Sequence, residues 1–99
     1  LRGSSGFSAF SSAKFALRAV AQSIARELGP QGIHVAHFII DGAIDTAFIK
    51  ENFPERYALK EKDGILCPEH IAETYWNIHT QRRTAWTHEI DLRPYMEKF

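Results

Sequence analysis

A phenylalanine and a lysine, Phe10 and Lys14, stand four residues apart in a segment whose apolar spacing predicts a helix. Residues at positions i and i+4 share one face of a helix, so the Lys14 ammonium is expected beside the residue one turn before it. An ammonium there can stabilise negative charge on a neighbouring oxygen. Phe10 has no hydroxyl, however, and cannot act as a general acid or base.

A second candidate site follows a predicted strand at residues 33–40. Asp41-Gly42 ends that strand abruptly, and Thr46 follows shortly after it. Ligands bind beyond the carboxyl ends of strands in open α/β sheets, so these residues are candidates to face a ligand. The alternative is a plain strand-ending turn.

The other reactive side chains form no recognisable site. His34 and His37 would lie on opposite faces of a strand, so they are not expected to share a metal ion. Ser11 and Ser12 have no paired base and are interpreted as serines at a helix start. Cys67 is the one cysteine, interpreted as a buried or helix-start residue in a reducing compartment.

The elements that must position these residues are a helix, a strand, a helix and a strand, in that order. An apolar stripe predicts the first helix over residues 9–28, and Gly29 is expected to end it in the left-handed cap conformation. Residues 33–40 are apolar on both faces, which is typical of a strand in a parallel sheet covered by helices. A second helix should begin at Pro68, and alternation predicts a final strand over residues 86–92.

Between the strand at 33–40 and the second helix, residues 43–66 are mixed in character. They are predicted to be irregular, with a short helical turn or two around Pro54. Phe48, Phe53 and Tyr57 supply an aromatic surface there, which could equally line a substrate pocket or form a contact surface.

Two strands alone leave both edges of a sheet unpaired, so the fold is expected to need more chain or a partner. The 99 residues carry twelve Lys and Arg against twelve Asp and Glu, so neither nucleic acid nor a membrane surface is an expected partner. No apolar run approaches the length of a membrane span. The start of the sequence lacks a signal-peptide pattern, so we expect a cytoplasmic chain. It also lacks an initiator Met, so we expect the chain to begin part-way through a longer protein.

Taken together, residues 6–46 resemble the second half of a short-chain dehydrogenase/reductase. The family pattern is Tyr-x-x-x-Lys on a long helix, then "ELGPxGIxV", a strand, and Pro-Gly-x-x-x-Thr. This sequence has Phe10-Ser-Ser-Ala-Lys14, then "ELGPQGIHV", then Asp41-Gly-Ala-Ile-Asp-Thr46. The resemblance implies an α/β fold in which residues 1–99 are the C-terminal portion of a Rossmann-like, doubly wound parallel sheet, without the N-terminal dinucleotide-binding half.

The resemblance also implies roles for particular residues. Phe10 takes the position of the catalytic tyrosine, where it is not competent, and Lys14 that of the lysine that binds the nicotinamide ribose. Asp41 stands where the family has proline, beside Gly42, and puts a carboxylate near the cofactor. Thr46 and the backbone near Ile44 would contact the nicotinamide carboxamide of NAD or NADP.

Two functions remain open from the sequence. One is NAD(P)-dependent carbonyl reduction or alcohol oxidation, weak or lost in this chain because of Phe10 and the absent glycine-rich phosphate-binding loop. The other is a non-catalytic oligomerisation or regulatory module. By resemblance, residues 9–28 and the last helix and strand would form homo-oligomer interfaces.

Overall fold

The computed structural model describes residues 3–99, which form two compact units. One unit comprises the chain up to Ile39 together with Gln81–Ile90. The other comprises Ile40–Thr80 together with Asp91–Phe99. Each unit is described by itself below.

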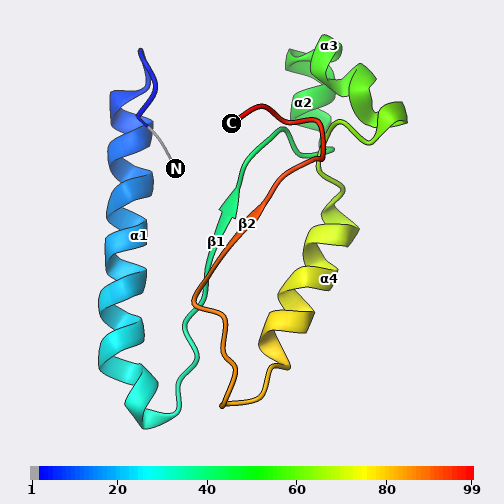
Figure 1. The fold of residues 1–99 in the computed structure, drawn as a ribbon. Helices are drawn as coiled ribbons and strands as arrows, with labels where there is room; N and C mark the ends of the chain where they lie inside the picture. The colour runs from blue at the N-terminus through cyan, green and yellow to red at the C-terminus, as the bar shows by residue number, and fades with distance from the viewer. Residues whose placement is uncertain (1–2) are drawn as a thin grey trace. The chain divides into compact units, whose positions relative to one another are not determined.

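The first unit is built on helix α1 (Ser8–Leu28), the long helix of Figure 1, which confirms the helix predicted from the apolar stripe. Its end differs from the prediction. Gly29 keeps right-handed helical angles and the chain continues into a 3-10 helix, η1 (Gly29–Gln31). The left-handed position is Gly32, with φ 86°, so Gly32 and not Gly29 ends the helical segment.

The strands are shorter than predicted. β1 covers His37–Ile40 and β2 covers Glu89–Leu92, and they pair in a two-stranded sheet. The His37 N–H donates to the His88 carbonyl at 2.7 Å, and the Asp41 N–H to the Leu92 carbonyl at 2.9 Å. Residue numbers rise along both strands from the first bond to the second, so the two strands are parallel (Figure 1). Residues 33–36 and 86–88, which were predicted to extend the two strands, lie outside β1 and β2.

The second unit holds more helix than expected between the strands. Four short elements follow β1: α2 (Ala47–Asn52), α3 (Pro54–Tyr57), the 3-10 helix η2 (Ala58–Lys62) and then α4 (Pro68–His79). Residues 43–66 were predicted to be irregular, with a short helical turn or two around Pro54. The helix at Pro54 confirms that part of the prediction, but helical segments cover residues 47–62, more than was expected. Local capping explains the difference, because the Thr46 side chain accepts the Ile49 N–H and Pro54 occupies a first-turn position.

The start of α4 confirms the predicted helix at Pro68. Cys67 is the N-cap residue, and its thiol donates a hydrogen bond to the Glu69 carboxylate at 3.0 Å. This hydrogen bond is the main cause that lowers the pKa of Glu69. The interpretation of Cys67 as a helix-start residue is therefore confirmed.

The buried apolar side chains among residues 3–99 are Ile65, Leu66, Ile78 and Pro94, all in the second unit. Gly64 is buried beside them, where an added Cβ would lie 2.7 Å from the Cβ of Leu59. By contrast, the stripe on α1 is largely open, with Leu17 53% and Val20 52% exposed. Among the described residues no helix is long and apolar enough to cross a membrane.

Candidate functional site

Helix α1 places the two candidate residues of the first unit on one face. The Lys14 ammonium lies 5.5 Å from the centre of the Phe10 ring, as the spacing of four residues predicts. Both residues are exposed, with 62% of Phe10 accessible to solvent. The contact is a cation–π interaction, which at an exposed site contributes roughly 0.5–1 kcal/mol. The arrangement leaves an ammonium open to a ligand and no side-chain oxygen beside it at position 10.

The second unit contains the other candidates, Asp41, Gly42, Ile44 and Thr46, in one turn after β1. Gly42 has φ 141°, a conformation that favours glycine. A Cβ added to Gly42 would lie 2.9 Å from the Cδ of Pro94, which is buried. Glycine is therefore required here for both the backbone conformation and the close approach of the chain that follows β2.

A parallel bridge to Leu66 fixes the backbone at Ile44. The Leu66 N–H donates to the Ala43 carbonyl at 2.7 Å, and the Asp45 N–H donates to the Leu66 carbonyl at 2.8 Å. The flanking residues make the bridge bonds, so the N–H and carbonyl of Ile44 itself point to the other side. This leaves one amide donor and one acceptor of the turn for a ligand.

Thr46 ends the turn and caps α2. Its hydroxyl oxygen accepts the Ile49 N–H at 3.3 Å, which leaves the hydroxyl proton able to donate. Beside it, the Asp45 carboxylate forms an ion pair with Lys60 at 2.9 Å. The Asp45 carboxylate is the main cause that raises the pKa of Lys60, and Tyr57 raises it further.

Sequence reasoning missed the arginine that holds this turn. Arg93 Nη1 lies 3.3 Å from the Asp41 carboxylate, and Nη2 pairs with Asp91. The Arg93 guanidinium also stacks on Phe99, with 3.4 Å from its Cζ to the ring centre. A signal for this contact was present, because Asp41 and Arg93 each follow a strand and the carboxyl ends of parallel strands meet at one edge.

A further charged cluster in the first unit was also missed. Arg18 donates two hydrogen bonds to the Glu89 carboxylate, from Nε at 2.8 Å and from Nη2 at 2.7 Å. His37, which is buried, lies 3.3 Å from the same carboxylate through Nδ1. The hydrogen bonds from Arg18 are the main cause that lowers the pKa of Glu89, and His37 lowers it further although burial opposes the shift. This cluster joins α1 to both strands.

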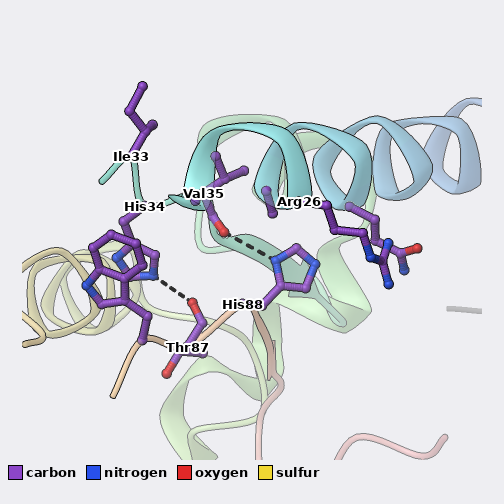
Figure 2. Close-up of a pocket in the computed structure, with 10 residues that line it drawn as sticks. Arg26, Ile33, His34, Val35, Thr87 and His88 are labelled. Carbon is purple, nitrogen blue, oxygen red and sulfur yellow. Dashed lines mark hydrogen bonds between the residues drawn. The ribbon is translucent and has the colours of Figure 1, made fainter. Parts of the chain in front are cut away.

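A cavity of about 300 Å³ lies in the first unit, lined by the end of α1 and the segments that enter the strands. Figure 2 shows the residues that line it. The His34 and Trp86 rings stack in its wall, 4.5 Å apart between centres. His34 Nε2 contacts the Thr87 carbonyl at 2.8 Å, and His88 Nδ1 contacts the Val35 carbonyl at 3.2 Å. Because these ring atoms already bind backbone carbonyls, the cavity wall serves to join the two segments.

The predicted site residues thus form two groups, with Phe10 and Lys14 in the first unit and the turn at 41–46 in the second. The two histidines considered for a metal have separate surroundings, since His34 stacks on Trp86 and His37 faces Glu89. Within residues 3–99 no group of three or more His, Cys, Asp or Glu residues is arranged to hold a metal ion.

Comparison with known proteins gives one similar solved structure, the crystal structure of a short-chain dehydrogenase from Rhodopseudomonas palustris. The TM-score is 0.66 and the sequence identity is 46%, over 96% of this chain and 34% of that one. This chain therefore spans about a third of the length of that dehydrogenase. No protein-family model matches the chain. No curated protein matches it significantly. The match supports the resemblance to short-chain dehydrogenases, and the helices and small parallel sheet agree with part of a Rossmann-like fold.

Proposed function

We propose that these 99 residues are the C-terminal portion of an NAD(P)-dependent oxidoreductase of the short-chain dehydrogenase/reductase type, acting on a carbonyl or alcohol substrate. The observation that carries this proposal is the 46% identity to a short-chain dehydrogenase over 96% of the chain. Lys14 one turn after position 10 on α1, and the glycine turn after β1, support it.

The residues of the turn fit the nicotinamide end of such a cofactor. A carboxamide needs both a donor and an acceptor, which the free N–H and carbonyl of Ile44 and the hydroxyl of Thr46 can supply. Lys14 offers an exposed ammonium for the hydroxyls of a ribose. When bound, NAD(P)H supplies a hydride to a carbonyl carbon, while the chain has to provide the proton for the carbonyl oxygen.

Phe10 cannot donate this proton. A tyrosine there would have its hydroxyl beside Lys14, whose charge favours the phenolate and so assists proton exchange. Phe10 keeps the ring but has nothing to donate. We therefore assign this chain the nicotinamide end of the cofactor site, with weak or no catalysis.

The test is to restore the hydroxyl with Phe10→Tyr in the full-length product of the gene. Carbonyl-dependent oxidation of NADPH and NADH, assayed on a panel of ketones and aldehydes, should rise by roughly 10²–10⁴-fold, the usual contribution of a general acid. Phe10→Leu is the matched control and should give no gain. A Phe10→Tyr protein that binds cofactor but reduces no carbonyl faster would contradict the assignment of position 10.

A second candidate, a non-catalytic oligomerisation module, has its own supporting observation. Leu17 and Val20 on α1 and Trp76 on α4 are more than half exposed, which is unusual for large apolar side chains in such numbers on a small chain. A second copy of the chain, or an intact homologue, is the partner that we propose for these faces.

A further inference from the structure

Arg93 is held at the proposed cofactor turn by three neighbours from the second unit. Its Nη1 lies 3.3 Å from the Asp41 carboxylate, its Nη2 pairs with Asp91, and its guanidinium stacks on Phe99. The side chain is 20% exposed, so it is mostly withdrawn from water.

The contact with Asp41 is ionic in character. Arg93 Nη1 is buried and has no hydrogen-bond partner among the described residues, although the Asp41 carboxylate lies beside it. What Arg93 supplies to Asp41 is therefore mainly positive charge. Asp91 accepts a hydrogen bond from Nη2 and takes the other part of that charge, and the two carboxylates are about equally exposed, at 38% for Asp41 and 37% for Asp91.

The residues on either side of Arg93 are also held against the turn at Asp41-Gly42. The Asp41 N–H donates to the Leu92 carbonyl at 2.9 Å, directly before Arg93. On the other side, Pro94 packs so closely on Gly42 that no Cβ would fit. These two contacts hold the backbone of Arg93 beside the turn that contains Asp41.

From this arrangement we infer that Arg93 sets which oxidation state of the nicotinamide cofactor the turn prefers, by compensating the charge of Asp41. The inference rests on the proposed function, which puts the turn at the nicotinamide ring. The oxidised ring carries a positive charge and the reduced ring is neutral, so an uncompensated Asp41 carboxylate attracts the oxidised form selectively. With Arg93 in place, its positive charge offsets that of Asp41, and the preference of the turn for the oxidised cofactor is smaller.

The test is to measure dissociation constants of NAD⁺ and NADH, and of NADP⁺ and NADPH, for the full-length gene product and its variants. Arg93→Gln should raise the ratio of the reduced to the oxidised dissociation constant about fivefold, the size of one screened charge–charge interaction. Asp41→Asn alone should lower that ratio, because only Asp91 then opposes the charge of Arg93. Combining the two should return the ratio close to that of the unmodified protein.

Arg82→Gln is the matched control, since it removes one exposed positive charge far along the sequence from the turn and should leave the ratio unchanged. Because Asp41→Asn is nearly isosteric, it keeps the test valid even if Arg93→Gln fails to fold. Variants that bind both oxidation states more weakly by the same factor would give Arg93 a structural role only and overturn the inference. Absence of cofactor binding in the unmodified protein would instead overturn the proposed function, and this inference with it.

Discussion

The Arg18 guanidinium and the Glu89 carboxylate meet side to side, with hydrogen bonds of 2.8 and 2.7 Å, and so join two residues that lie 71 positions apart. Arg18 is on α1 and Glu89 begins β2. Both side chains are partly buried, at 35% and 24% exposure. Such bidentate, charge-assisted pairs are stronger than ordinary hydrogen bonds.

Arg18→Gln should therefore lower the free energy of unfolding by about 1–3 kcal/mol, the range for a hydrogen-bonded charge that loses its partner. Urea unfolding followed by circular dichroism measures this change. Arg26→Gln, on the exposed last turn of the same helix, is the control and should change the free energy by less than about 1 kcal/mol. Equal effects of the two substitutions would contradict the assigned role of Arg18.

The same cluster predicts how stability depends on pH. The folded state lowers the pKa of Glu89 below its ordinary value of 4.5, chiefly because of Arg18. As the pH falls, the unfolded chain takes up the proton first, so the stabilisation is present in full above about 4.5 and is lost as the pH falls through the folded pKa.

Unfolding free energies measured from pH 6 down to about pH 3 should therefore fall more steeply for the unmodified protein than for Glu89→Gln. Glu89→Gln keeps an acceptor for Arg18 but cannot titrate. Parallel pH curves for the two proteins would show that Glu89 does not carry this dependence.

Gly42 gives a prediction about the turn itself. Gly42→Ala should destabilise the protein by roughly 1–3 kcal/mol, because φ 141° is strained for alanine and its Cβ would meet Pro94. Gly29→Ala is a matched control, since Gly29 has φ −53° and open space around the added Cβ. Gly29→Ala should be neutral or stabilise by up to about 1 kcal/mol. Thermal unfolding of the two variants compares them directly.

The exposed stripe on α1 gives a prediction about assembly. If it covers a second copy, Leu17→Glu and Val20→Glu should each shift the protein toward monomer in sedimentation velocity, because a charge cannot be buried there without a partner. Ala19→Glu, exposed and on another face of the helix, should leave the distribution unchanged. A protein that sediments as a monomer before any substitution would remove the oligomerisation proposal.

The sequence predicted the parts of the fold that depend on local periodicity. The stripe on α1 and Pro68 at the start of α4 located both main helices, and the spacing of four residues predicted the contact between Phe10 and Lys14. The strand at 33–40 was predicted too long. Apolar side chains favour an extended chain, but a ladder forms only where a partner strand is in register, and that occurs at His37–Ile40.

Of the two charged pairs that sequence analysis missed, one could have been predicted and the other could not. The pair of Asp41 and Arg93 was within reach of sequence reasoning, since both residues follow parallel strands. The pair of Arg18 and Glu89 was not, because its geometry depends on how a helix packs against a strand far along the chain. Similarly, the helices between 47 and 62 depend on capping by Thr46 and on Asp63 in the left-handed conformation, which composition alone did not indicate.

The central claim is that this chain retains the nicotinamide end of a cofactor site, and calorimetric titration of the full-length gene product with NADPH and NADH tests it most directly. We predict saturable binding that Lys14→Ala weakens by at least about tenfold, since a charged hydrogen bond is lost. Lys98→Ala, an exposed lysine near the end of the chain, should bind as the unmodified protein does. A folded protein that binds neither cofactor, or that binds equally well without Lys14, would contradict the claim.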